Sequence, residues 1–186
     1  MTNFQKKLEE IIRVDHAGEM GAKVIYDGQM AALKIKGDVE TLELVKHMKE
    51  QEDVHFDYFN SEIKRQKLRP TLMQPIWKVG GFALGFFTAL ADKKAAMTCT
   101  TAVEEVIDEH YREQIEALTK EEKFLDENQK KEVVALKEKI KKFRDEELEH
   151  RDIAYENKAA ELNGFAPLSA FIKMTTKFAI AVSKKV

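Results

Sequence analysis

Residues 143–152 read FRDEELEHRD, a run in which seven of ten side chains carry a formal charge. Such a run is typical of a helix face that is exposed to water. Glu147 and His150, however, are three residues apart, and side chains at this spacing lie on the same side of a helix. The stretch therefore either faces solvent or directs a carboxylate and an imidazole inward toward a metal ion.

The same spacing occurs a second time in the chain. In residues 50–57, EQEDVHFD, the glutamate and the histidine are Glu52 and His55. Each Glu-x-x-His segment is preceded by a segment with a further glutamate, Glu19 or Glu104. When these two are aligned, four more positions match at a constant offset of 85 residues: Tyr26 with Tyr111, Gln29 with Gln114, Ala32 with Ala117, and Leu33 with Leu118. One Glu-x-x-His is a weak signal, but a duplicated arrangement favours a site over coincidence.

Acidic neighbours leave the register of this pattern open by one position. Glu105 follows Glu104, and Glu146 precedes Glu147, so either member of each pair can be the inward one. The histidine spacing selects Glu147, as it selects Glu52. The repeat selects Glu104, because Tyr111 follows it by seven residues, which is nearly two helical turns.

Helical periodicity extends along almost the whole chain, which contains only 3 prolines and 8 glycines. We expect one domain, 1–186, with an all-α fold: a ferritin-like four-helix bundle of two repeated helical hairpins, with extra amphipathic, membrane-facing helices. The hairpins cover about 4–69 and 94–162. Their helices are expected to end near Gly37, Arg69, Lys120 and Leu162, with Asp38 and Asp126 at two helix starts and a C-terminal helix at about 168–183.

Composition excludes several classes of protein. The chain is 44% hydrophobic and 34% charged, which is ordinary for a helical globular protein, and its formal net charge of −2 attracts neither nucleic acid nor anionic lipid. Its single cysteine, Cys99, excludes an intramolecular disulfide and a cysteine-based zinc cluster. We expect no secretory signal, because the N-terminal residues are amphipathic and charged throughout. A glycine-rich dinucleotide fingerprint is also absent from the sequence.

Four carboxylates and two imidazoles suit a pair of iron or manganese ions, and ligand type alone permits both metals. In ferritin-like bundles such pairs are held by a glutamate from each of two helices and a Glu-x-x-His from each of the other two. The predicted metal ligands are therefore Glu19, Glu52, His55, Glu104, Glu147 and His150.

Four neighbouring residues have open roles. Tyr111 either hydrogen-bonds near the metals or caps the core, whereas we favour core packing for Tyr26. Asp15 either orients a histidine ligand or lies on the helix surface. His110 is expected at the rim of the site and not as a ligand.

The segment between the hairpins, residues 71–94, is the most apolar part of the chain. Its uncharged run of thirteen residues, from Val79 to Ala91, is shorter than the roughly 20 that a spanning helix needs. It favours a helix in the membrane interface, with Trp77 at headgroup level and Lys78 extending to water. A buried core helix, or an oligomer interface through the Gly81-x-x-x-Gly85 motif, fits the residues equally well. The C-terminal helix, with Phe171, Phe178 and Ile180, adds to the same apolar surface.

Three stretches carry a resemblance to a known family. IIRVDHAGEMGA (11–22), the two Glu-x-x-His segments and KKFRDEELEHRD (141–152) resemble the demethoxyubiquinone hydroxylases, from about Ile11 to the C-terminus. The resemblance implies iron in place of manganese at the same six ligands, and it places the family's His–Tyr pair on His110 and Tyr111. One departure is a longer link between the third and fourth helices, residues 120–134.

The resemblance also implies a reaction and its partners. The expected activity is the last ring hydroxylation in ubiquinone biosynthesis, with dioxygen as co-substrate and an external reductant, for which NADH is a candidate. The substrate is then a polyprenyl demethoxyubiquinol. Because its polyprenyl tail is apolar, membrane docking becomes the favoured interpretation of Trp77–Ala91. The implied location is the cytoplasmic face of a bacterial membrane or the matrix face of the mitochondrial inner membrane.

Two other functions compete with the hydroxylase. A ferritin-like iron store or peroxide scavenger uses the same ligands but needs no apolar docking segment. A scaffold for other ubiquinone-synthesis proteins needs no working metal site. Partners among these proteins, or a homo-oligomer, are compatible with the sequence, and nucleic acid is not expected.

Overall fold

The computed structural model describes residues 3–185, and all the regular secondary structure in that range is helical. The six α-helices are α1 (Asn3–Lys36), α2 (Val39–Arg65), α3 (Gln74–Ala91), α4 (Lys93–Glu121), α5 (Glu127–Glu156) and α6 (Phe165–Ser183); two short 3-10 helices are η1 (Glu122–Phe124) and η2 (Ala159–Glu161). Residues 1, 2 and 186, at the limits of the predicted domain, lie outside the described range. That residues 1–186 form a single domain stays a prediction.

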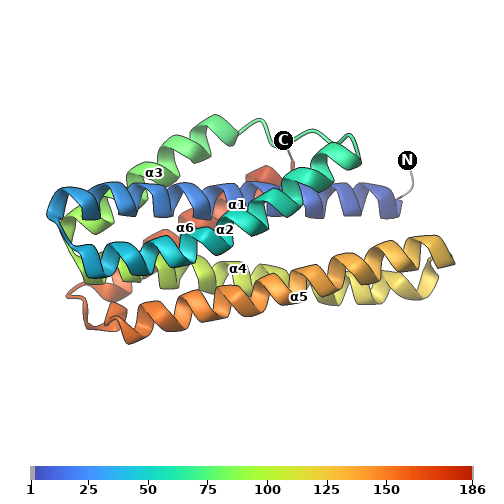
Figure 1. The fold of residues 1–186 in the computed structure, drawn as a ribbon. Helices are drawn as coiled ribbons and strands as arrows, with labels where there is room; N and C mark the ends of the chain where they lie inside the picture. Colours follow the sequence, from blue (N-terminus) through green and yellow to red (C-terminus); the bar gives the residue numbers. More distant parts are fainter. Residues whose placement is uncertain (1–2, 186) are drawn as a thin grey trace.

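Two antiparallel hairpins, α1–α2 and α4–α5, pack against each other as two layers (Figure 1). The first hairpin turns at Gly37, whose φ of +71° suits glycine, and Asp38 then caps α2 by accepting a hydrogen bond from the Thr41 amide at 3.1 Å. In the second hairpin, Asp126 forms a capping box with Gln129 at the start of α5. The predicted all-α, ferritin-like bundle of two hairpins is confirmed.

Two predicted helix ends were wrong. The second helix ends at Arg65, not near Arg69, because Lys67 has a left-handed φ of 54° that no helix continues. The fourth ends at Glu156, not near Leu162, because Lys158 has a φ of 68°. The last helix correspondingly starts earlier than residue 168: Gly164 precedes it, and Pro167 lies in its first turn, where a missing N–H needs no partner.

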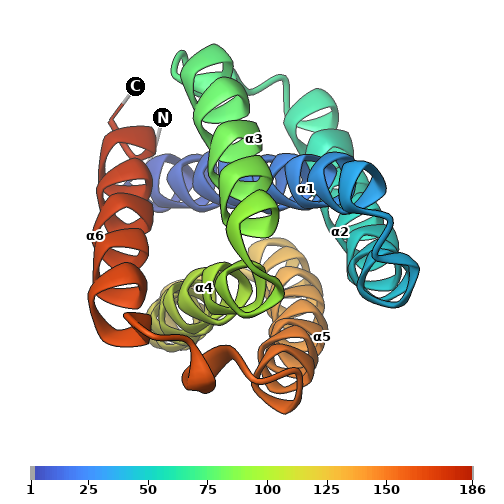
Figure 2. The same ribbon diagram turned by 90° about the vertical axis from the view of Figure 1, so that its left-hand side faces the viewer.

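The two extra helices pack on the same side of the bundle. Both α3 and α6 contact α1 and α4, while α2 and α5 lie toward the other side (Figure 2). The indole N–H of Trp77 on α3 donates a hydrogen bond to the Ser183 hydroxyl at the end of α6, at 3.1 Å. The most apolar helices of the chain are thus joined to each other.

The Gly81-x-x-x-Gly85 motif packs within this chain, against α1. A Cβ atom at Gly85 would overlap the carbonyl oxygen of Ile25, and one at Gly28 would overlap the carbonyl oxygen of Phe82. The contact is therefore between two helix backbones that approach each other through glycine. The motif is accounted for by this intramolecular crossing and needs no oligomer interface.

We expect Gly85→Ala to destabilise the protein by about 1–3 kcal/mol, because the added methyl group meets backbone atoms that cannot move alone. Gly80→Ala is the matched control on the same helix: no atom lies within 4 Å of its added Cβ, so it should stabilise α3 by about 0.5–1 kcal/mol. Urea unfolding of both variants measures the difference. Equal stabilities would contradict the close crossing of α1 and α3.

Apolar side chains pack on both sides of the bundle centre. One buried cluster includes Ile12, Phe59 and Phe143, and the other includes Leu33 and Met48. Along α2 and α5, the predicted metal ligands fall between the residues of these two clusters. Close-packed apolar layers therefore enclose the polar centre at both ends.

Candidate metal centre

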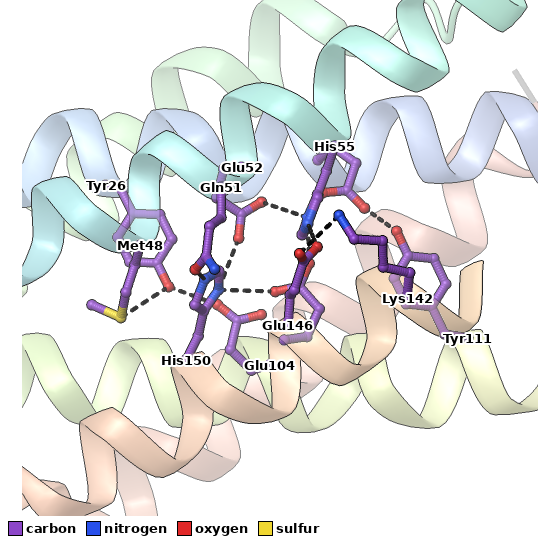
Figure 3. Close-up of polar contacts among 12 residues, drawn as sticks. Tyr26, Met48, Gln51, Glu52, His55, Glu104, Tyr111, Lys142, Glu146 and His150 are labelled. Atoms are coloured by element: carbon purple, nitrogen blue, oxygen red, sulfur yellow. Dashed lines mark hydrogen bonds and ion pairs between the residues drawn. The ribbon is translucent and has the colours of Figure 1, made fainter. Parts of the chain in front are cut away.

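All six predicted ligands are buried in the middle of the bundle, each no more than 3% exposed. Glu19 comes from α1, Glu104 from α4, and a Glu-x-x-His pair from each of α2 and α5. Figure 3 shows four of the six, Glu52, His55, Glu104 and His150, directed toward one another between the helices. The structure brings these residues together as the repeat predicted. Their role as metal ligands stays a prediction.

The six side chains form two overlapping groups that share two carboxylates. Within each group, one potential ligand atom per residue lies within 4.8 Å of all the others: Glu19, Glu52, His55 and Glu147 form one group, and Glu52, Glu104, Glu147 and His150 form the other. Glu147 Oε1 lies 3.0 Å from Nδ1 of His55, and its Oε2 lies 3.2 Å from Nδ1 of His150. The arrangement offers two adjacent cation positions, with Glu52 and Glu147 between them.

Burial controls the protonation of these groups. It raises the pKa of Glu52 and Glu104 well above the ordinary value, and repulsion from the Glu147 carboxylate adds to this effect. Burial also opposes ionisation of Glu147, but hydrogen bonds from His150 and His55 outweigh it and lower the pKa of that carboxyl. Burial lowers the pKa of His55, yet its hydrogen bonds to Glu147 and Glu19 dominate and raise the value to about 12.

The donor set fits a pair of divalent cations. Both carboxylate oxygens of Glu52 and Oε2 of Glu104 are buried without a hydrogen-bond partner. Among residues 3–185, no lysine or arginine forms an ion pair with any of the four glutamates of the cluster. Four ionised carboxylates carry the charge that two divalent ions neutralise, and buried unpaired carboxylates are strongly unfavourable otherwise.

Two tyrosines connect the hairpins by crossed hydrogen bonds. Tyr26 on α1 donates to Oε1 of Glu104 on α4 at 2.9 Å, and Tyr111 on α4 donates to Oε1 of Glu19 on α1. Each tyrosine thus holds the glutamate of the opposite hairpin. Tyr26 packs in the core as favoured, but its hydroxyl also contacts a candidate ligand, and Tyr111 likewise contacts the site.

The outer nitrogen of each histidine has a partner that the sequence did not reveal. His55 Nε2 lies 2.8 Å from Oε2 of Glu146, and His150 Nε2 lies 2.7 Å from Oε1 of Gln51 (Figure 3). Glu146 and Gln51 are the residues directly before the two shared glutamates. That position in the repeat was the available signal, but Glu146 was considered only as an alternative inward residue.

Neither role expected for Asp15 is found: it is buried, so it does not lie on the helix surface, and its contacts in the described residues are with neither predicted histidine ligand. Its Oδ1 accepts a hydrogen bond from Nε2 of Gln114 at 2.6 Å and lies 3.6 Å from Nε2 of His110. His110 lies outside the two groups and lines a cavity of about 180 Å³ between α1, α4 and the residue that follows α6, and its place at the rim of the metal site stays a prediction. The hydrogen-bond network of these three residues connects that cavity to the helix turn before Glu19.

We expect the metal-free protein to be more stable near pH 5.5 than near pH 8. Folding raises the pKa values of Glu19, Glu52 and Glu104 above the value near 4.5 that they have in the unfolded chain. The stability that these groups contribute is present below pH 4.5 and is lost as the pH rises through their folded-state pKa values. The raised pKa of His55 acts in the same direction above 6.5. Mn²⁺ must displace these protons, so it should raise Tm more at pH 8 than at pH 5.5. Thermal unfolding with and without Mn²⁺ tests this; equal shifts at both pH values would contradict it.

Two repeated hairpins that enclose four glutamates and two histidines define the class of the protein: a ferritin-like helical bundle with a buried Glu/His cluster that could hold metal ions. The family model described as "Ubiquinone biosynthesis protein COQ7" matches residues 6–183. The chain belongs to this family.

Named relatives agree with this assignment. The chain is 45% identical over 179 residues to the 3-demethoxyubiquinol 3-hydroxylase of Rhodospirillum rubrum, covering 96% of this chain and 78% of that protein. It is 44% identical over 178 residues to the mitochondrial NADPH-dependent 3-demethoxyubiquinone 3-hydroxylase of Homo sapiens, covering 96% and 77%. A third relative is the mitochondrial 5-demethoxyubiquinone hydroxylase of Saccharomyces cerevisiae, at 36% identity over 183 residues, covering 96% and 78%. The relatives are named as hydroxylases of one ring system.

Proposed function

We propose that this protein is a di-iron monooxygenase that hydroxylates the ring of a polyprenyl 3-demethoxyubiquinol with dioxygen. The observation that carries the proposal is the buried pair of overlapping ligand groups, with Glu52 and Glu147 common to both. The hydroxylase names of the relatives supply the reaction and the substrate class. The residues proposed to hold the metals are the six predicted ones.

Iron is preferred over manganese because of the family, since the ligand types suit both metals. When bound, a pair of ferrous ions supplies the electrons and the Lewis acidity that dioxygen activation requires. The protein contributes a site that is shielded from bulk solvent, because the six side chains are buried, and its four carboxylates would balance two divalent charges. Hydrogen bonds from Tyr26 and Tyr111 hold one oxygen each of Glu104 and Glu19 and fix their orientation.

An external reductant would have to supply two electrons per turnover, because a monooxygenase reduces the second oxygen atom of dioxygen to water. The human relative is named NADPH-dependent. We propose a reduced nicotinamide as the source of electrons, with NADPH in place of the NADH considered from the sequence.

The surface formed by α3 and α6 is the proposed membrane-docking face. Its large apolar side chains are exposed to solvent: Ile76, Val79, Phe82, Phe87 and Leu90 on α3, and Phe171, Met174 and Phe178 on α6. Within residues 3–185, α6 is the helix whose length and composition are sufficient to cross a membrane. Because α6 packs along α4 in the same bundle, we propose that it lies on the bilayer and does not span it.

This docking mode favours a peripheral location. The human and yeast relatives are named mitochondrial, and another relative is bacterial. We propose the matrix face of the mitochondrial inner membrane, or the cytoplasmic face of a bacterial membrane, according to the source.

Reconstitution tests the proposed activity. The protein is loaded anaerobically with Fe²⁺ and mixed with a short-tailed demethoxyubiquinol analogue, NADPH and air, and the quinone products are identified by mass spectrometry. Ring hydroxylation that depends on added iron is expected. Consumption of peroxide without ring hydroxylation would contradict the proposal and would indicate a scavenger or an iron store.

A further inference from the structure

The metal centre is nearly symmetric, and its departure from symmetry lies outside the ligands. The glutamate, histidine and tyrosine of one hairpin each have a counterpart in the other. Gln51 and Glu146 occupy equivalent positions, one residue before the shared glutamates, but one is a neutral amide and the other a carboxylate. This difference distinguishes the two sides of an otherwise duplicated site.

Both residues act across the hairpin interface on the histidine of the opposite helix. Nδ1 of each histidine faces the carboxylates of the cluster, at 3.0 Å from Glu147 for His55 and 3.2 Å for His150. Nε2 faces away from the cluster, to Glu146 at 2.8 Å for His55 and to Gln51 at 2.7 Å for His150. With Nδ1 directed at a cation, Nε2 carries the proton and donates it to these oxygens.

The two acceptors differ in charge and therefore in their effect on the imidazole. A carboxylate accepts a stronger hydrogen bond than an amide oxygen and makes the imidazole a stronger donor to a cation. The charge of Glu146 is partly balanced by Lys142, whose Nζ lies 3.1 Å from its Oε1. Lys142 is 58% exposed, whereas Glu146 is 22% exposed and directs its other oxygen at His55. Solvent therefore screens the lysine more than it screens the Glu146–His55 contact.

We propose that Glu146 is a positioning residue that makes the metal position at His55 bind more tightly than the position at His150, so that the two positions fill in a fixed order. This inference rests on the proposed two-metal site. Gln51 orients His150 without adding charge, and the second position is correspondingly weaker.

A titration of the metal-free protein with Mn²⁺ tests the proposal, with free Mn²⁺ counted by its EPR signal. The wild-type protein should bind two ions in two steps. Glu146→Gln should weaken the tighter step by on the order of tenfold and bring the steps together, because loss of an outer partner of a ligand histidine has effects of that size. Gln51→Glu should tighten the weaker step. Glu149→Gln, an exposed charge removal on the same helix, is the matched control and should leave both steps unchanged.

Three further variants assign the steps to positions. The exchange variant, with Glu146→Gln and Gln51→Glu together, keeps the net charge and should reverse the order of filling. His150→Ala should retain the tighter step, and His55→Ala should lose it. Circular dichroism confirms that each variant is folded before its titration is interpreted.

The outcomes separate this inference from the function on which it rests. A wild-type protein that binds neither Mn²⁺ nor Fe²⁺ would overturn the two-metal site itself. Two bound ions whose affinities are unaffected by Glu146→Gln and by Gln51→Glu would overturn the inference and leave the proposed function standing. An equal loss of affinity in the Glu149→Gln control would show a general charge effect and would also overturn it.

Discussion

Replacement of Glu147 by alanine is expected to remove both metal ions and to lower ring hydroxylation by on the order of 10³-fold, about 4 kcal/mol in transition-state free energy. Glu147 belongs to both ligand groups and lies close to both histidines. Its loss removes a ligand from both metal positions at once. The measurement is iron content per chain after anaerobic loading, together with the hydroxylation rate.

Glu104→Ala provides the contrast, because Glu104 belongs to one group only. This variant should retain about one iron, at the position near His55, while hydroxylation is lost as in Glu147→Ala. The exposed Glu149 is the control, and Glu149→Ala should bind two irons and remain active. If Glu147→Ala kept two irons, the shared position of this residue would be refuted; if it supported quinone synthesis in cells, a scaffold role would replace the proposed activity.

The double variant with Phe87→Asp and Phe178→Asp is expected to lose at least about 100-fold in affinity for vesicles. These side chains are 65% and 63% exposed on α3 and α6. Each phenylalanine contributes about 1.5–3 kcal/mol when it is removed from water, and the introduced aspartates oppose insertion further. Co-sedimentation with vesicles of neutral phospholipid measures the effect. Hydroxylation of a short-tailed, water-soluble analogue should be unchanged, because neither residue touches the metal centre.

Phe124→Asp is the matched control for this variant. Phe124 is 85% exposed, but it lies on η1 and not on the proposed docking face. Its replacement should leave vesicle binding unchanged, and equal loss in both variants would contradict a specific face. Phe86 is unsuitable for this test, because it is only partly exposed and packs against the buried cluster that contains Leu33 and Met48.

The convergence of the six ligands was predictable because it depends on spacing within helices. Residues three apart share a helix side, and a repeated hairpin places equivalent residues at equivalent heights in the bundle. The choice of Glu104 over Glu105 followed from the same logic, and the structure buries Glu104 at 2% exposure. Local periodicity was therefore sufficient to predict which six side chains meet in the centre of the bundle.

Contacts between hairpins were not predictable in the same way. The hydrogen bond from Tyr26 to Glu104 and the contacts of Glu146 and Gln51 with the opposite histidines depend on how the helices are rotated about their axes. No local spacing encodes that rotation. The helix ends at Arg65 and Glu156 were missed for a different reason, since each is set by the left-handed backbone of a single lysine that is not a usual helix stop.

The packing of α3 also depended on information that the sequence left ambiguous. The Gly81-x-x-x-Gly85 motif fitted a membrane helix, a core helix or an oligomer interface equally well. A Cβ atom at Gly85 would overlap the carbonyl oxygen of Ile25, which shows that this side of α3 packs on α1. The opposite side of α3 is exposed to solvent. One helix thus satisfies a core contact and presents an apolar surface.

The most direct test of the central claim is the source of the new ring oxygen. The iron-loaded protein is supplied with the demethoxyubiquinol analogue and NADPH under ¹⁸O₂ in ordinary water, and the mass of the product is measured by mass spectrometry. A monooxygenase built on these six residues predicts one ¹⁸O atom in the ring hydroxyl and no labelled product from Glu147→Ala. An unlabelled hydroxyl, or labelled product from protein without iron, would contradict it.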